Sequence, residues 1–244
     1  MKADPAVQRG LLDLAEVDAE LNRIDHRRRT APELAEIAEA EKAVRARRDA
    51  RVAVQTQLDD LDREVARQEK EIDAVRAREE RDRKLLDAGA GARQVADLEH
   101  ELESLVRRKA ALEDDLLELM ERREAVEADG QHAAVELEKA EAALAEVRHR
   151  HQENLADLDS QQARRDADRA KLVATFPEPL VAQYERKRKA KGIGAALLRA
   201  RRCGACRLEL DRRVISVIKE TAPDEVVECE ECGVILVRTA ESGL

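Results

Sequence analysis

The chain has 244 residues, of which 41% are charged and only 1% are aromatic, with one Phe, one Tyr and no Trp. Aromatic side chains usually supply much of the buried area of a core, so this composition excludes one ordinary globular domain. The net charge of −9 excludes general binding of nucleic acid, although a local basic segment could still bind it. Because Ala, Glu, Arg and Leu are abundant and Gly and Pro are scarce, we expect long helices.

The sequence predicts no membrane segment. No run of residues approaches the roughly 20 apolar residues that a spanning helix requires. The chain begins Met-Lys-Ala-Asp-Pro, without an apolar signal segment. We therefore expect a cytoplasmic protein with reduced cysteines and no membrane partner.

The first part of the chain predicts two helices with one interruption. Asp4-Pro5 is a good helix start, because Asp caps helices and Pro is favoured at the first helical position. A coiled-coil seam with spacings of three and four follows, at Val7, Gly10, Leu14, Val17, Leu21 and Ile24. It is interrupted at residues 28–33, where Thr30 and Glu33 match a capping box. A second, more polar seam then runs from residue 37 to residue 86.

Glycines predict a turn near residues 87–92. Asp87-Ala88-Gly89-Ala90-Gly91 stops the helical pattern, and a third seam then holds its register for eleven heptads, becoming polar at Asn154, Gln161 and Asp168. The two arms on either side of Gly89 have nearly equal lengths. They predict an antiparallel coiled-coil hairpin over residues 1–175, each arm about 120 Å long, in a monomer or weak dimer. A parallel dimer of separate coiled-coil segments is the alternative.

The predicted hairpin register has one local consequence. Pairing residues whose numbers sum to 179 places Arg27, Arg28 and Arg29 beside the stretch Arg148-His149-Arg150-His151. This would form a basic collar around the hairpin. The alternative is a solvated helix kink without a ligand.

All four cysteines lie in two C-x-x-C elements, Cys203-Gly-Ala-Cys206 and Cys229-Glu-Glu-Cys232, separated by residues 207–228. Thiolates at i and i+3 of a tight turn grip one side of a tetrahedral ion, and two such turns complete the shell. Gly233 follows the last cysteine, where a positive φ often lets backbone N–H groups point at sulfur. We therefore expect one structural Zn²⁺ held by Cys203, Cys206, Cys229 and Cys232 in a ribbon of residues 195–244.

Three other uses of the cysteines are less consistent with the sequence. A redox dithiol is typical of a βαβ setting, which the pattern lacks, and disulfides need an oxidising compartment. Iron is chemically acceptable, but no aromatic residues surround the cysteines. A closed four-thiolate zinc site leaves no open coordination position, so we do not expect catalysis there.

Residues 176–194 form the predicted junction between the hairpin and the ribbon. Both aromatic residues, Phe176 and Tyr184, lie in it, and we expect them to pack the hairpin against the ribbon rather than to stack on nucleic-acid bases. A short helix over residues 180–190 should end at Gly192 and Gly194. In the ribbon, we expect a strand over residues 195–202, a short helix or turn at 214–218 and a hairpin of residues 226–228 with 234–237.

A basic run leads into the first C-x-x-C element. Between residues 186 and 202 there are eight Lys or Arg and no acid: Arg186, Lys187, Arg188, Lys189, Lys191, Arg199, Arg201 and Arg202. This run is the best candidate for binding nucleic-acid phosphates or an acidic protein partner. The alternatives are a solvated helix face or basic residues that offset the charge of a four-thiolate zinc centre.

The chain resembles a bacterial family of C4-type zinc-ribbon proteins with an N-terminal coiled-coil hairpin, long catalogued as a domain of unknown function. The resemblance rests on the first C-x-x-C element, on Pro223-Asp-Glu-Val-Val-Glu-Cys229-Glu-Glu-Cys232-Gly233, and on the stretches Leu98-Glu-His-Glu-Leu-Glu-Ser-Leu105 and Leu112-Glu-Asp-Asp-Leu-Leu-Glu-Leu-Met120. It implies that the four cysteines bind zinc. The Ala- and Arg-rich composition is similar to that of actinobacterial proteins. Relatives in flagellated and type-III-secreting bacteria look like adaptors that bind an alternative sigma factor, secretion components or messenger RNA. The resemblance implies an adaptor here, but it does not imply which partner is bound.

Together these patterns predict a mainly α protein, with a long antiparallel helical hairpin followed by a small β-rich zinc ribbon. No nucleophile–base pair, phosphate loop or open metal site is evident in the sequence. We expect a non-enzymatic adaptor that binds protein partners through the coiled coil and the ribbon and has no small-molecule substrate. The alternative is an RNA- or DNA-binding protein that uses the basic run.

Overall fold

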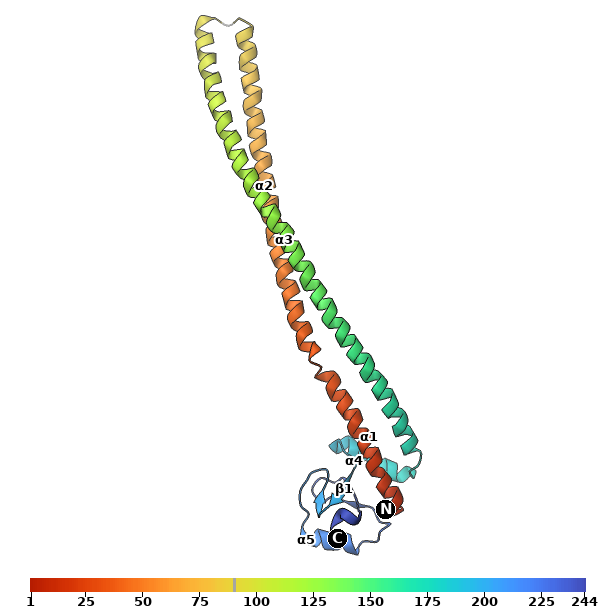
Figure 1. The fold of residues 1–244 in the computed structure, drawn as a ribbon. Coiled ribbons are helices and arrows are strands. Elements are labelled where there is room, and N and C mark those ends of the chain that lie inside the picture. The colour runs from red at the N-terminus through yellow and green to blue at the C-terminus, as the bar shows by residue number, and fades with distance from the viewer. Residues whose placement is uncertain (90) are drawn as a thin grey trace. The chain divides into compact units, whose positions relative to one another are not determined.

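The computed structural model describes residues 1–89 and 91–244. Four helices precede the ribbon (Figure 1): α1 (Pro5–Arg29), α2 (Glu33–Asp87), α3 (Ala92–Val173) and α4 (Glu178–Lys191). The ribbon contains β1 (Ala195–Arg199), β2 (Arg202–Cys203), α5 (Arg212–Glu220), β3 (Val227–Glu228), β4 (Ile235–Val237) and the 3-10 helix η1 (Ala240–Ser242). The expected fold class is confirmed. Ala90, within the predicted turn, lies outside the described residues.

The chain forms two compact units. The hairpin unit is Ala35–His149, and the ribbon unit combines Met1–Leu34 with Arg150–Leu244. The long helix α3 contributes to both units, since it runs from Ala92 to Val173. Among the described residues, no helix combines the length and apolar character that a bilayer span requires.

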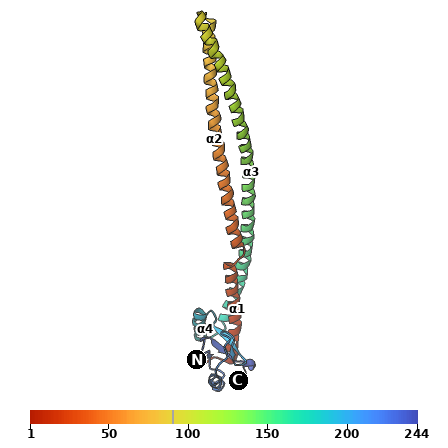
Figure 2. The same ribbon diagram turned by 90° about the vertical axis from the view of Figure 1, so that its left-hand side faces the viewer.

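In the hairpin unit, α2 and α3 lie side by side in antiparallel directions (Figures 1 and 2). A small core contains Val44, Leu137 and Leu144, with Ile37, Ala40 and Ala140 packed against it. Ion pairs join the helices elsewhere, for example Arg48 with Glu141 at 2.6 Å. Exposed pairs of this kind contribute at most about 1 kcal/mol each. The polar seam of α2 is therefore held mainly by intermittent apolar layers.

The interruption between α1 and α2 lies within residues 28–33, but the expected capping box does not form. The Thr30 hydroxyl donates to the His26 carbonyl at 2.9 Å, so Thr30 ends α1 instead of capping α2. The Glu33 side chain accepts a hydrogen bond from the Asn154 amide at 3.2 Å. In a capping box, the Glu33 carboxylate would accept a hydrogen bond from the backbone of its own helix. Here it contacts α3 instead.

The predicted basic collar is wrong. Arg28 pairs with Asp159 at 2.5 Å, so these residue numbers sum to 187 instead of 179. Arg148 pairs with Glu41 at 2.7 Å. The shift is already present within α2, because the pairs Arg48 with Glu141 and Arg148 with Glu41 both sum to 189, whereas Arg78 with Glu101 nearer the turn sums to 179. Arg28, Arg29 and Arg148 therefore each pair with an acid instead of forming a basic collar.

The ribbon unit contains a four-stranded sheet with the order β2-β1-β4-β3. β1 is antiparallel to β2 and parallel to β4, and β3 is antiparallel to β4. The single strand expected over residues 195–202 is in fact two strands. Ala200 and Arg201 separate them with φ values of 43° and 63°. A turn of two left-handed residues without glycine gives little sequence signal, which explains the error.

The two faces of this sheet pack against different parts of the molecule, because neighbouring residues of a strand point to opposite sides. On one face, Ala196, Leu198 and Leu236 pack with the cysteines and with α5. On the other face, Ala195, Ile235 and Val237 pack with α1 and α4 through Leu11, Leu14, Leu180 and Tyr184. One thin sheet therefore joins the metal centre to the first helix.

Both aromatic residues lie where the sequence predicts, in the core shared by α1, α4 and the sheet. Tyr184 is fully buried, and Phe176 packs against the same cluster. A Cβ on Gly10 would lie 3.1 Å from Cε1 of Phe176, so the glycine in the first seam allows the ring to approach α1. This supports the predicted packing role of the aromatics.

The first three residues extend the ribbon sheet. The Ala3 amide donates to the Asp224 carbonyl at 2.7 Å, and the Val226 amide donates to the Met1 carbonyl at 2.9 Å. Lys2 forms the matching antiparallel bridge with Glu225. Residues 1–3 are thus hydrogen-bonded to residues 224–226, which lie more than 220 positions away in the sequence.

We expect Gly194→Ala to destabilise the ribbon unit by about 1–3 kcal/mol, the range for overpacking a filled core. The added Cβ would lie 2.5 Å from Cε2 of the Tyr184 ring, which is fully buried. Urea unfolding followed by tyrosine fluorescence measures this change. The control is Gly91→Ala, where the added Cβ has no atom within 4 Å. Equal effects of the two substitutions would contradict the predicted clash.

Candidate metal centre

The first cysteine pair lies in a tight turn that begins at β2. The Cys203 amide donates to the Leu208 carbonyl at 3.0 Å, and the Arg207 amide donates to the Cys203 carbonyl at 2.8 Å. Gly204 fits against β1, because a Cβ at this position would lie 2.8 Å from the Leu197 carbonyl oxygen. The glycine between the cysteines therefore allows the turn to approach the sheet closely.

The second cysteine pair repeats this backbone arrangement. The Cys229 amide donates to the Val234 carbonyl at 2.9 Å, and the Gly233 amide donates to the Cys229 carbonyl at 2.8 Å. Gly233 has a φ of 73°, and Arg207 at the equivalent point of the first turn has a φ of 61°. The positive φ expected for Gly233 is confirmed. The first turn adopts the same conformation at a non-glycine residue, at a cost of roughly 1–2 kcal/mol.

The four sulfur atoms gather at one point. All four Sγ atoms lie within 4.8 Å of one another, with Cys203 and Cys232 3.7 Å apart and Cys206 and Cys229 3.9 Å apart. A tetrahedral ion with Zn–S bonds of 2.3 Å requires sulfur–sulfur distances of about 3.8 Å. A disulfide requires about 2.05 Å. The donor set and its spacing therefore fit one Zn²⁺.

Burial and backbone dipoles act on the thiols in opposite directions. Burial raises the pKa of Cys203 to about 12 and also raises the pKa of Cys232. The backbone N–H of Leu208 lowers the pKa of Cys206. Zinc binds thiolates, so occupation of the site by the ion requires proton loss from the buried cysteines. The closed four-sulfur shell has a structural role and leaves no position for a substrate.

The structure divides the predicted basic run between two elements. Five of its residues, at positions 186–189 and 191, lie on α4, and Arg199, Arg201 and Arg202 lie in the ribbon strands and the turn between them. On α4, Lys187 pairs with Glu228 at 2.5 Å, and Arg188 reaches Asp18 at 3.1 Å. These two side chains thus join α4 to the ribbon and to α1.

The basic residues of the ribbon also have local partners. Arg199 pairs with Glu241 at 3.1 Å and Arg202 with Glu209 at 3.3 Å, and Arg201 donates to the Gly243 carbonyl at 3.2 Å. Five of the eight predicted residues therefore contact an acid or a carbonyl. Three exposed residues remain as candidates for an external anion: Arg186, Lys189 and Lys191.

A buried ionic cluster centred on Asp18 was not predicted from the sequence. This carboxylate is 4% exposed and accepts hydrogen bonds from the Tyr184 hydroxyl at 2.7 Å and from Nε of Arg169 at 2.8 Å. Arg188 is the third donor, and Glu185 contacts both arginines. The cluster ties α1, α3 and α4 together. A charged residue beside the seam position Val17 was its only sequence signal.

Comparison with known proteins agrees with this architecture. The profile of the CT398-like coiled coil hairpin domain matches residues 14–192, and that of the C4-type zinc ribbon domain matches residues 202–236. The chain belongs to the CT398-like coiled-coil hairpin family. The zinc ribbon expected from the cysteine spacing is thereby confirmed.

Members of the CT398-like family and solved structures resemble the chain over nearly its whole length. An uncharacterized protein of Mycobacterium tuberculosis is 46% identical over 98% of both chains. A structure from Mycobacterium smegmatis has 43% identity and a TM-score of 0.90, covering 98% of this chain and 100% of that one. The CT398 structure from Chlamydia trachomatis has 18% identity and a TM-score of 0.69, covering 95% and 97% of the two chains. This last likeness concerns the fold alone.

Proposed function

We propose that this protein is a non-enzymatic cytoplasmic adaptor that binds a partner protein through α3 of the hairpin unit. The observation that carries the proposal is a row of exposed apolar side chains on that helix. Val106, Leu117, Met120 and Val135 are each between 48% and 60% exposed. At 100° per residue they fall within roughly 60° of one another around the helix axis.

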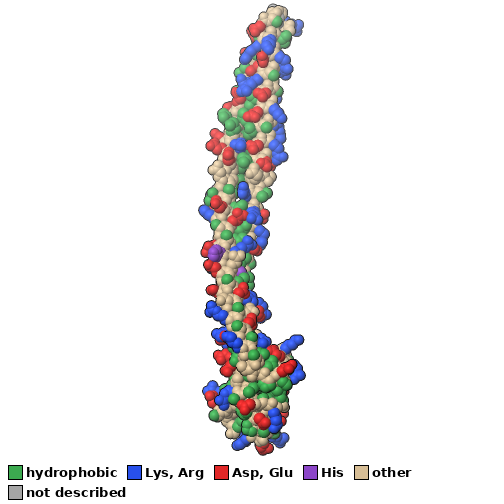
Figure 3. All heavy atoms as spheres, turned by 90° about the vertical axis from the view of Figure 1, so that its right-hand side faces the viewer, with side chains coloured by type: hydrophobic (Ala, Val, Ile, Leu, Met, Phe, Trp, Pro, Cys, Tyr) green, Lys and Arg blue, Asp and Glu red, His purple; other side chains and the backbone are tan. Residues whose placement is uncertain are grey.

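The surroundings of this row support binding of a protein. On the face drawn in Figure 3, acidic and basic side chains alternate along the helices, with hydrophobic side chains exposed between them. An apolar row bordered by charged residues is the pattern that an amphipathic partner helix recognises. The closed zinc shell supports a structural rather than a catalytic role for the ribbon. The basic run supports the nucleic-acid alternative less, because most of its residues have partners within the chain.

The double substitution Leu117→Glu with Met120→Glu tests this proposal. We expect it to reduce recovery of the partner at least about tenfold, since each lost apolar anchor weakens binding by roughly 1–3 kcal/mol. The measurement is affinity purification from the native cell with quantitative mass spectrometry. Circular dichroism establishes that the variants remain helical.

Ala111→Glu is the matched control. Ala111 is also exposed on α3, but six residues from Leu117 place it on a different side of the helix. A protein that the wild type and the control both recover, and that the double variant loses, supports the adaptor function. Equal recovery by all three would contradict it.

A further inference from the structure

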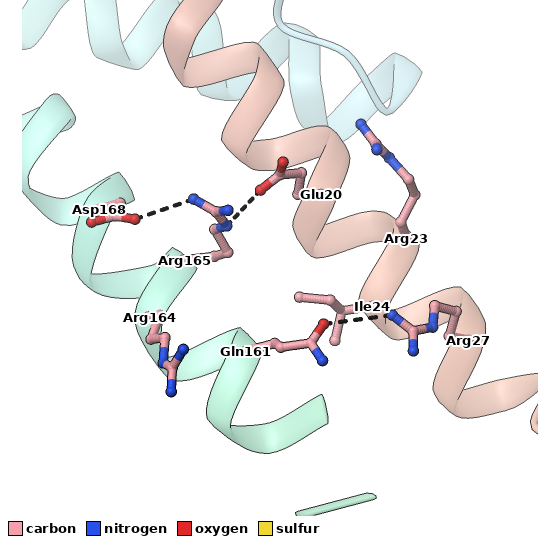
Figure 4. Close-up of a pocket in the computed structure, with 8 residues that line it drawn as sticks. All are labelled: Glu20, Arg23, Ile24, Arg27, Gln161, Arg164, Arg165 and Asp168. Carbon is pink, nitrogen blue, oxygen red and sulfur yellow. Dashed lines mark hydrogen bonds and ion pairs between the residues drawn. The ribbon is translucent and has the colours of Figure 1, made fainter. Parts of the chain in front are cut away.

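An open groove lies between α1 and the last turns of α3, within the ribbon unit (Figure 4). Its volume is about 410 Å³, and it is lined by positions 20–27 of α1 and 161–168 of α3. Each span is eight residues long, just over one heptad, where a coiled coil would normally place apolar layers. Here Ile24 is the single apolar side chain of the lining. The polar seam positions Gln161 and Asp168 consequently face a groove and not a core.

The groove is acidic at one end only. Nε of Arg165 contacts Glu20 at 2.5 Å, and NH1 of Arg165 contacts Asp168 at 3.4 Å. Figure 4 shows Arg165 held between these two carboxylates, which come from opposite helices. Arg165 therefore forms ion pairs with both acidic residues of the lining.

The other end, at Arg27 and Gln161, has no acid in the lining. Arg27 donates to the side-chain oxygen of Gln161 at 3.5 Å, a long contact with a neutral group. Arg23 projects from α1 near Glu20 and Arg164 projects from α3 (Figure 4), and neither forms an ion pair with any described residue. This contrasts with neighbouring Arg28, which pairs with Asp159. Among the described residues, three arginines of the lining thus have no carboxylate partner: Arg23, Arg27 and Arg164.

The chemistry of these side chains selects a class of ligand. All of the basic residues in the lining are arginines, whose planar guanidinium forks bind phosphate oxygens through paired, charge-assisted hydrogen bonds. An anion with two or three negative charges would balance these unpaired guanidinium groups. The volume falls within the range of small-molecule sites. We propose that the groove binds a small anion carrying phosphate groups, held by Arg27 and Arg164.

Isothermal titration of the full-length, zinc-loaded chain with inorganic pyrophosphate at low ionic strength tests this site. Arg27→Gln and Arg164→Gln should each weaken binding at least about tenfold, because each removes a charged donor to the anion. The control is Arg122→Gln, which removes an exposed arginine paired with Glu118 in the hairpin unit. It should change the affinity less than about twofold. Circular dichroism and zinc content are measured for every variant.

Two further ligands identify what is recognised. Adenosine diphosphate should bind with about the affinity of pyrophosphate and should lose that affinity in both groove variants. Tighter binding of the nucleotide that survives the substitutions would overturn the proposal, since recognition would then lie elsewhere. So would the absence of saturable pyrophosphate binding by the wild type. A single-stranded RNA that binds through Arg27 and Arg164 while pyrophosphate does not would overturn the small anion in favour of nucleic acid.

Discussion

Removal of zinc with a strong chelator should unfold the ribbon sheet and release α1 from it, while residues 35–149 keep their helices. Structural zinc contributes about 10–16 kcal/mol in small zinc-binding peptides, which matches or exceeds the total stability of most domains, about 5–15 kcal/mol. The sheet that carries the cysteines on one face packs Leu11 and Leu14 of α1 on the other. Loss of the metal therefore removes the surface on which α1 is buried.

Hydrogen exchange measured by mass spectrometry resolves the two units. After chelation, peptides from residues 195–237 and from α1 should exchange rapidly, and those from the core around Val44 and Leu137 should remain protected. Fluorescence of Tyr184, the single tyrosine in a chain without tryptophan, reports its exposure at the same time. Zinc should restore both signals and magnesium should not. Unchanged protection of residues 195–237 after metal loss would refute this coupling.

The second large effect is expected for Asp18→Asn, which should destabilise the ribbon unit by about 3 kcal/mol or more. The substitution keeps the size of the side chain but removes a buried negative charge. Arg169 and Arg188 would then share Glu185 as their remaining acid in the cluster. Thermal unfolding of the zinc-loaded protein measures the loss.

Asp25→Asn on the same helix is the control. Asp25 pairs with Arg29 at 2.7 Å, but both side chains are more than half exposed, so we expect a change below about 0.5 kcal/mol. If the two substitutions had equal effects, the Asp18 cluster would have no special role in stability.

Alkaline titration gives an independent test of the same cluster. Burial, together with the hydrogen bond to Asp18, raises the pKa of Tyr184 well above its ordinary value near 10. The folded state therefore holds the phenol proton more tightly than the unfolded state. The resulting stability is present below about pH 10 and is lost as the pH rises further. In Asp18→Asn, phenolate absorbance should appear at a lower pH than in the wild type.

The parts of the fold that the sequence predicts well depend on local patterns. The cysteine pairs, Gly233 and the helix end at Gly192 follow from turn chemistry within a few residues. Heptad spacing likewise locates the long helices without knowledge of their partners. Aromatic scarcity made the position of Phe176 and Tyr184 informative, because so few residues could fill a junction. Turn motifs, heptad spacing and aromatic scarcity can all be recognised in a single sequence.

The features that the sequence did not predict depend on tertiary contacts. Asp18 looks like an ordinary solvated residue until α3 and α4 bring Arg169 and Arg188 to it. The partners of the basic run, such as Glu228 and Glu241, lie about 40 residues away in the chain. The pairing register with α3 drifts along the chain, from a residue-number sum of 179 for Arg78 with Glu101 to 187 for Arg28 with Asp159. None of these has a periodicity that could reveal it.

Because residues 1–3 are hydrogen-bonded to residues 224–226, the N-terminal segment can complete its native contacts only after nearly the whole chain has been synthesised. At roughly 5–20 residues per second, about 10 to 45 s separate translation of these two segments. The helices of the hairpin unit can pair during this time, since their partners are already made. Leu11 and Leu14 can be buried only after the ribbon strands have been synthesised. The complete four-cysteine zinc site can form only after Cys232 has been synthesised. During this interval the newborn N-terminal helix is an exposed apolar surface that a chaperone can bind.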